Sequence, residues 1–256
     1  MRDSAGGRAA LAILATHHLA QNFLLVERGY VPGNLAVAGL LLGVGRRSGL
    51  RWEEMGLQPR DLPRGLRMGF LGSGVAATVA LLALSHPRTR ELLRDERASL
   101  PEGGRPWKRV LIRFPLGTAL FEEVAFRGVL PALLSKHRHE RSADAVSAVL
   151  FGLWHLIPAH RALSGNPLGQ GRFRSRRWAV TLGGSIAAGV SGLAFSWMRR
   201  TTGSLLAPWM IHSALNSFSF LAGAAALQSP GDSWSSSSAI AQSDDTPGGM
   251  TSGGQR

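Results

Sequence analysis

The chain has 256 residues, of which 29 are Lys or Arg and 16 are Asp or Glu, so its formal net charge is +13. Apolar residues make up 45% of the chain and gather in long runs between Arg-rich connectors, which excludes an ordinary soluble domain and predicts a membrane protein. The absence of cysteine excludes disulfides, Cys-ligated zinc and a thiol nucleophile. Any catalyst must therefore use carboxylate, imidazole, hydroxyl or amide groups.

Seven apolar runs are candidate transmembrane segments, or eight if one of them is split. They predict an all-α, polytopic bundle of about seven to eight transmembrane helices. The second run is shorter than the roughly 20 residues that cross a bilayer, so its helix is expected to tilt, to begin nearer Glu27 or to be partly re-entrant. In chain order the runs are residues 9–26, 31–44, 68–85, 110–134, 143–157, 178–198 and 204–227.

This pattern divides the chain into three parts. We predict N-terminal transmembrane helices with basic connectors at 1–109, a catalytic membrane core at 110–227, and a disordered tail rich in Ser and Gly at 228–256. The basic residues are spread over separate connectors and form no nucleic-acid-binding motif. We therefore expect contact with anionic lipid headgroups in the cell membrane and no nucleic-acid partner.

Four charged residues lie inside the apolar run at 110–134: Arg113 and, in the sequence FEEVAFRGVL, Glu122, Glu123 and Arg127. An ionised side chain at bilayer depth costs about 2.5–3.5 kcal/mol, so three within six residues require a specific role. On an α-helix, Glu123 and Arg127 share one face and can pair, whereas Glu122 projects about 100° away. We therefore predict that Glu122 acts as a general base or acid and that the other two are structural. The alternative is a structural network of all three charges.

Two further pairs are spaced four residues apart on apolar helices: Phe151 with His155 in FGLWH, and His212 with Asn216 in MIHSALNSF. This spacing places both members of a pair on one helix face. An imidazole exchanges protons near neutral pH, which suits His155 for catalysis with Phe151 as support. The second pair can donate two hydrogen bonds to one carbonyl oxygen, as an oxyanion site requires. The alternative for His155 is a polar cap beside the interfacial Trp154. The alternative for His212 and Asn216 is a hydrogen bond between helices.

Together these motifs supply a carboxylate, two imidazoles and an amide from three apolar helices. Such groups can activate water and stabilise the tetrahedral intermediate of amide hydrolysis. Glu122, His155 and His212 can alternatively bind a divalent metal such as zinc, because two His and one Glu leave one coordination position for water. The residues alone do not separate the two mechanisms, and they indicate no other cofactor.

The order EExxxR, FxxxH and HxxxN on hydrophobic helices resembles the CAAX protease and bacteriocin-processing (CPBP) family of intramembrane endopeptidases. The resemblance covers residues 111–220 and includes the Gly-Ser and Pro that precede the last motif in TGSLLAPWMIHSALNSF. It implies a membrane-associated peptide or protein substrate. Members are described as metalloproteases and also as glutamate-dependent enzymes, so the resemblance does not decide whether the site binds a metal. It implies that Glu122 and His155 activate water and that His212 and Asn216 stabilise the oxyanion. It also implies that Glu123 and Arg127 support these residues.

Two other functions compete with this hypothesis. The sequence GVSG at 189–192 fits the GxSG pattern of rhomboid serine proteases, with Ser191 as nucleophile and His212 as its partner. The polar cluster could also belong to a non-catalytic membrane scaffold or a bacteriocin-immunity protein. We assign no role to the histidines outside the motifs, His17 and His18 included.

Overall fold

The computed structural model describes residues 3–24, 27–95, 98–99, 105–163 and 176–228. Within these ranges helices are the only extended regular elements, and one isolated bridge joins Leu57 to Ser204. The tail predicted at 228–256 lies outside the described residues except for its first position. The elements are α1 (Asp3–Phe23), α2 (Glu27–Arg47), η1 (Pro59–Asp61), α3 (Leu62–Ser85), α4 (Pro87–Leu93), α5 (Pro106–Lys108), η3 (Arg109–Ala119), α6 (Leu120–Glu123), η4 (Val124–Val129), α7 (Leu130–Ser135), α8 (Glu140–Trp154), α9 (Leu156–Ala162), α10 (Arg177–Thr202) and α11 (Leu206–Gln228).

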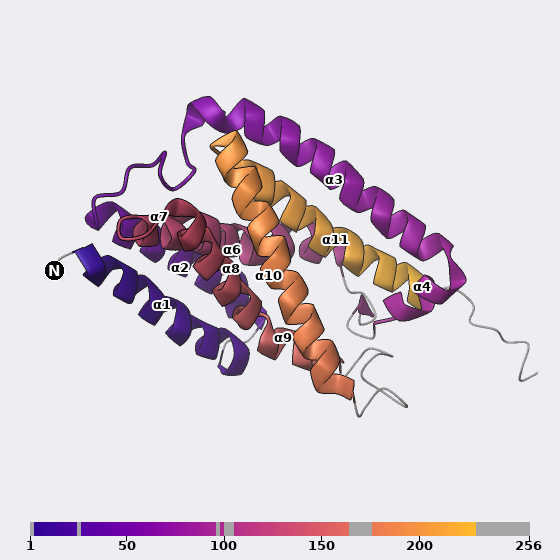
Figure 1. Ribbon diagram of the computed structural model, residues 1–256. Helices are drawn as coiled ribbons and strands as arrows, with labels where there is room; N and C mark the ends of the chain where they lie inside the picture. Colours follow the sequence, from indigo (N-terminus) through magenta and orange to yellow (C-terminus); the bar gives the residue numbers. More distant parts are fainter. Residues whose placement is uncertain (1–2, 25–26, 96–97, 100–104, 164–175, 229–256) are drawn as a thin grey trace, which may run out of the picture.

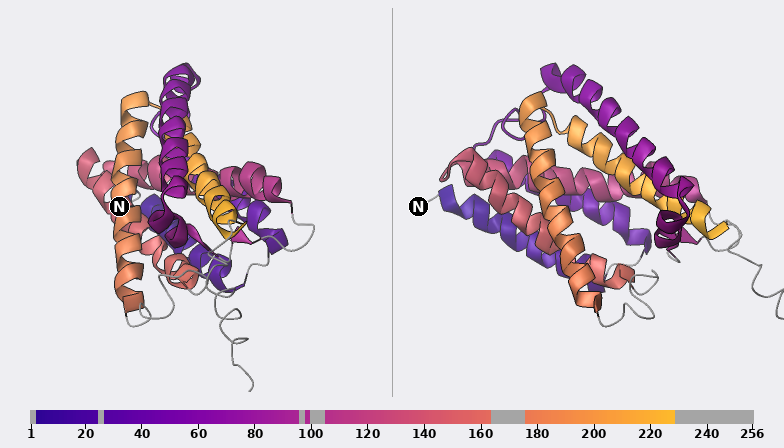
Figure 2. Two further views of the ribbon diagram at one scale, coloured as in Figure 1. Left: turned by 90° about the vertical axis from the view of Figure 1, so that its right-hand side faces the viewer. Right: turned by 45° about the vertical axis from the view of Figure 1, so that its right-hand side comes forward.

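The helices pack around the continuous helical stretch from α5 to α7. In Figure 1, α3 lies along α11, and α10 packs against α8 and crosses the middle of the molecule. Helices α1 and α2 lie side by side, with α2 against η3 and η4. The right-hand view of Figure 2 shows α1 and α2 next to each other. The core therefore gathers around α6, which carries Glu122 and Glu123.

A sharp corner between α10 and α11 fixes where the last helix begins. Gly203 ends α10 with a φ of +74°, which a residue with a Cβ rarely adopts, and an added Cβ would lie 2.7 Å from Asp61 Oδ2. Two residues later, the backbone N–H of Leu205 donates to the carbonyl oxygen of Gly56 at 2.9 Å. These contacts anchor α11, the helix that carries His212 and Asn216.

Four helical segments of the described chain are long and apolar enough to cross a membrane: Pro59–Ser85, Glu140–Ala162, Arg177–Thr202 and Leu206–Gln228. The predicted total of seven to eight is not confirmed. The helical stretch around α6 is not among these four segments because it carries several charged residues. Helix α1 likewise includes polar residues such as His17.

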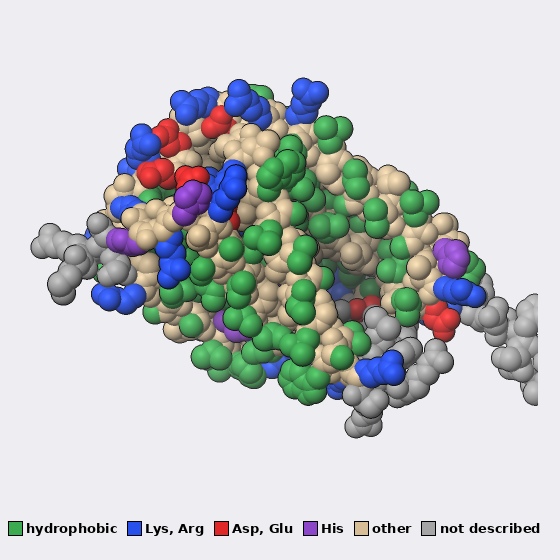
Figure 3. Space-filling view, in the orientation of Figure 1, with side chains coloured by type: hydrophobic (Ala, Val, Ile, Leu, Met, Phe, Trp, Pro, Cys, Tyr) green, Lys and Arg blue, Asp and Glu red, His purple; other side chains and the backbone are tan. Residues whose placement is uncertain are grey.

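The lipid-facing side of the bundle is clearest on α10. Exposed apolar side chains follow this helix, and its exposed Trp178 and Trp197 are nineteen residues apart, or about 28 Å at 1.5 Å per residue. This spacing matches the roughly 30 Å hydrocarbon core, whose two interfaces favour tryptophan. Figure 3 shows hydrophobic side chains along α10, and Lys and Arg gathered at the end of the molecule where α3 begins. The described part of the chain is therefore all-helical, and its four long apolar helices indicate a membrane protein.

Candidate active site

The EExxxR motif lies on a stretch that departs from regular α-helical geometry. Helix α6 is flanked by η3 and η4, whose wider turns are π-helical, and Pro115 lies inside η3. π-Helical turns often occur at functional sites because they change the direction in which side chains project. Every residue from Phe121 to Leu130 is buried. The sequence predicted a continuous helix over this run but not the π-helical turns.

Glu123 and Arg127 form an ion pair at the centre of the bundle, as their spacing predicts. The Arg127 Nε atom lies 3.4 Å from Glu123 Oε2, and the two residues are 2% and 0% exposed. The other carboxylate oxygen of Glu123 lies 2.8 Å from Nδ1 of His212, and that contact was not predicted. Glu123 therefore connects the arginine to a proposed catalytic histidine and fixes the orientation of its ring.

Glu122 points away from that ion pair, toward both imidazole rings. Its Oε1 atom accepts a hydrogen bond from the indole Nε1 of Trp154 at 3.2 Å. Its Oε2 atom lies 4.0 Å from Nε2 of His155 and 3.7 Å from Nε2 of His212. Oε2 is buried and has no hydrogen-bond partner among the described residues. The structure thus brings together three of the four proposed catalytic side chains.

The ring of His155 is held by Phe151, its predicted partner. Nδ1 of His155 lies 2.8 Å from the backbone carbonyl oxygen of Phe151, which can only accept, so Nδ1 is the donor. The neutral ring therefore presents an unprotonated Nε2 to Glu122. The Phe151 ring also contacts the His155 ring at 4.4 Å and lies 3.8 Å from the guanidinium carbon of Arg127. Phe151 thus packs against both the histidine and the ion pair.

Asn216 follows His212 by one turn of α11 and is half-buried. Its side-chain amide makes no hydrogen bond to another residue in the described ranges. It lies on the same helix face as His212. The pairing of Asn216 with His212 at an oxyanion stays a prediction.

Comparison with known proteins gives one match. The family model described as "Type II CAAX prenyl endopeptidase Rce1-like" matches residues 106–218, the stretch that contains all three motifs. This matched stretch, residues 106–218, is called the Rce1-like core below. No curated protein and no solved structure shows a significant match to the chain. The Rce1-like core includes Glu122, His155 and His212.

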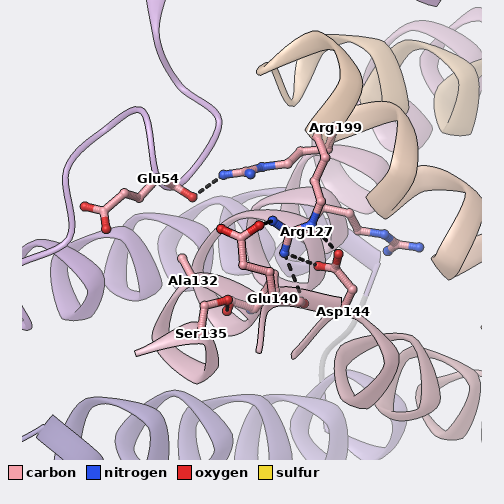
Figure 4. A pocket seen from close by; sticks show the side chains of 9 residues that line it. Glu54, Arg127, Ala132, Ser135, Glu140, Asp144 and Arg199 are labelled. Carbon is pink, nitrogen blue, oxygen red and sulfur yellow. Dashed lines mark hydrogen bonds and ion pairs between the residues drawn. The ribbon is translucent and has the colours of Figure 1, made fainter. Parts of the chain in front are cut away.

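A polar pocket lies beside the ion pair of the Rce1-like core. It has a volume of about 100 Å³, and Figure 4 shows Arg127, Arg199, Glu54 and Asp144 around it. The two terminal nitrogens of Arg127 are buried without a hydrogen-bond partner in the described part of the chain. A polar pocket of this size holds water, which can hydrate a guanidinium group. We interpret the pocket as the source of hydration for this arginine.

The donor atoms of the Rce1-like site are of the types that bind zinc, but their arrangement does not form a metal site. Among the described residues, no three His, Cys, Asp or Glu side chains gather in a way that could hold a metal ion. The predicted set of Glu122, His155 and His212 therefore lacks the required arrangement in this structure.

The serine-protease alternative receives no support from the Rce1-like core. Ser191 is exposed on α10, and its hydroxyl donates to the backbone carbonyl oxygen of Ala187 at 2.9 Å. His212 instead contacts Glu123 and stacks on Phe195 at 5.6 Å between ring centroids. Within the described residues, Ser191 and His212 form no hydrogen bond.

One residue of the site was missed in the sequence. Trp154 was interpreted as part of an interfacial aromatic belt, but it is only 6% exposed, and its N–H donates to Glu122. The sequence feature that could have indicated its role is its position directly before His155. A buried indole N–H requires a hydrogen-bond acceptor, and a carboxylate on a neighbouring helix can supply one.

Proposed function

We propose that this protein is an intramembrane endopeptidase of the cell membrane that hydrolyses a peptide bond in a membrane-associated substrate. The Rce1-like core and the four apolar helices support this class of function. The observation that carries the proposal is the position of Glu122 Oε2, buried without a hydrogen-bond partner among the described residues and facing Nε2 of both His155 and His212. An acceptor in this environment can take a proton from water.

In the proposed mechanism, Glu122 and His155 activate the attacking water. Their 4.0 Å separation is too long for a direct hydrogen bond, and a water between them can donate one hydrogen to each. As the water oxygen attacks the carbonyl carbon of the scissile bond, Glu122 takes one of its protons. The carbonyl π bond breaks, and its electron pair becomes the oxyanion of a tetrahedral intermediate.

His212 and Asn216 stabilise this oxyanion. Because Nδ1 of His212 donates to Glu123, its Nε2 can also donate only when the ring is an imidazolium. The imidazolium Nε2–H and the Asn216 amide then supply two donors from one helix face. The electron pair of the oxyanion then re-forms the carbonyl π bond, the C–N bond breaks, and the proton held by Glu122 passes to the leaving amine. The Glu122 carboxylate is thereby restored.

Cleavage by the purified protein in lipid vesicles, measured by mass spectrometry on a panel of membrane-anchored peptides, tests this function. Because the described donor atoms do not gather around a metal position, we expect the rate to stay within about 2-fold after dialysis against a chelator. Loss of cleavage that returns when zinc is added would assign a metal to Glu122, His155 and His212. Absence of cleavage of any peptide would contradict the proposed function.

The same assay separates the proposal from the serine-protease alternative. Ser191→Ala removes a hydroxyl that lies on the exposed side of α10, so we expect a rate within about 2-fold of the unmodified protein. A serine nucleophile would instead make this variant inactive, with a loss of several orders of magnitude.

A further inference from the structure

The first helix of the chain contacts the active site, although it lies outside the Rce1-like core at 106–218. The ring of His17 meets the ring of Phe121 edge to face at 5.0 Å, directly beside Glu122. The ring of His18 lies 4.4 Å from the ring of Trp154. Two histidines without an assigned role therefore contact the residues next to the proposed base.

Trp154 links these contacts to the catalytic carboxylate. Its indole ring is enclosed by Phe121 at 5.6 Å and Phe126 at 5.5 Å as well as by His18. Its N–H donates to Glu122 Oε1 at 3.2 Å. Because the terminal torsion of a glutamate is broad, a carboxylate without such a bond can rotate. With Oε1 held, Oε2 keeps its direction toward the two imidazoles.

The histidines are themselves fixed by hydrogen bonds. Nε2 of the buried His17 bonds to Oδ1 of the buried Asn34, which joins α1 to α2. Asn22 Nδ2 lies 3.3 Å from Nδ1 of His18 and donates to the His18 backbone carbonyl oxygen at 2.8 Å. The ring that packs on Trp154 therefore has a defined orientation.

We propose that His18 and Trp154 are positioning residues, and that helix α1 completes the active site by holding the indole N–H on Glu122. The His17–Asn34 hydrogen bond secures α1 in this place. The effect on catalysis rests on the proposed endopeptidase function. The hydrogen bond from Trp154 to Glu122 does not depend on that function. A small displacement of a catalytic group can cost about 10²-fold in rate, so this support affects turnover more than substrate binding.

The kinetic test uses Trp154→Phe, which keeps most of the aromatic ring and removes the N–H. We expect kcat to fall by about 10-fold or more with KM within about 2-fold, because a hydrogen bond to a charged group is lost. His18→Ala is expected to lower kcat by about 3- to 10-fold, and His18→Phe, which restores a ring, should recover most of the loss.

The control is another pair of neighbouring His and Trp rings. The ring centroids of His160 and Trp178 lie 4.2 Å apart at an interplanar angle of 21°, and neither residue belongs to the three motifs. Trp178→Phe and His160→Ala are expected to leave kcat within about 2-fold. A kcat for Trp154→Phe that equals that of the Trp178→Phe control would overturn the proposal.

A spectroscopic test needs no catalysis. The chain has seven tryptophans, and the indole N–H signal that Trp154→Phe removes from an NMR spectrum of the full-length protein identifies Trp154. We expect Glu122→Gln and His18→Ala to shift that signal and His160→Ala to leave it in place. No shift with Glu122→Gln would refute the hydrogen bond even in an active protease. A clear shift in a protein that cleaves no peptide would instead support the positioning and contradict the protease function.

Discussion

Glu122→Gln is expected to lower kcat for peptide cleavage by about 10²- to 10⁴-fold, with KM within about 3-fold of the unmodified protein. A general base contributes a factor of this size, and the amide retains the shape of the side chain but cannot take a proton from water. The amide oxygen can still accept the hydrogen bond from Trp154, so the melting temperature should change little. Cleavage rates on vesicle-reconstituted protein, together with thermal unfolding, measure both quantities.

A suitable control for this substitution is Glu140→Gln on α8. The Glu140 side chain is 69% exposed and pairs with Arg200 at the surface, so the same chemical change should leave kcat within about 2-fold. A Glu122→Gln protein that folds normally and cleaves within a few-fold of the unmodified rate would show that Glu122 is not the base.

Arg127→Met is expected to destabilise the protein by about 3–5 kcal/mol, as for the loss of one partner from a buried ion pair. Methionine fills much of the same volume, but it leaves the fully buried Glu123 without its cation. It also removes the guanidinium group from the face of Phe151. Thermal or denaturant unfolding in detergent measures the change. Glu122→Gln, which keeps this pair intact, should be clearly more stable than Arg127→Met.

Arg51→Gln provides the matched control for loss of an arginine. The Arg51 side chain is 72% exposed and pairs with Glu53 and Glu54 at the surface, so removing its charge should cost about 1 kcal/mol or less. If Arg127→Met unfolds at the same denaturant concentration as Arg51→Gln, the buried pair is not a structural element of the core.

The parts of the site that follow from spacing within one helix could be predicted from the sequence. The i, i+4 interval places Arg127 against Glu123 and Phe151 against His155, and both contacts occur in the structure. The charges in an apolar run also pointed to Glu122, because membrane interiors exclude charges that lack a role.

Contacts between helices could not be predicted in this way. The bond from His212 to Glu123, the indole N–H on Glu122 and the ring of His18 on Trp154 all depend on how separate helices pack. Spacing along the chain does not determine that packing. The π-helical turns on both sides of α6 were missed for a related reason, since hydrophobic periodicity assumes regular α-helical geometry.

A double-mutant cycle on the cleavage rate tests most directly whether Glu122 and His155 act on one water molecule. The cycle compares kcat/KM for Glu122→Gln, His155→Ala and the double variant in vesicles. Residues that act as a unit are strongly non-additive, so we expect the double variant to cleave within about 3-fold of the slower single variant. Losses that multiply in the double variant would show that the two residues act independently, and that result would contradict a shared catalytic water.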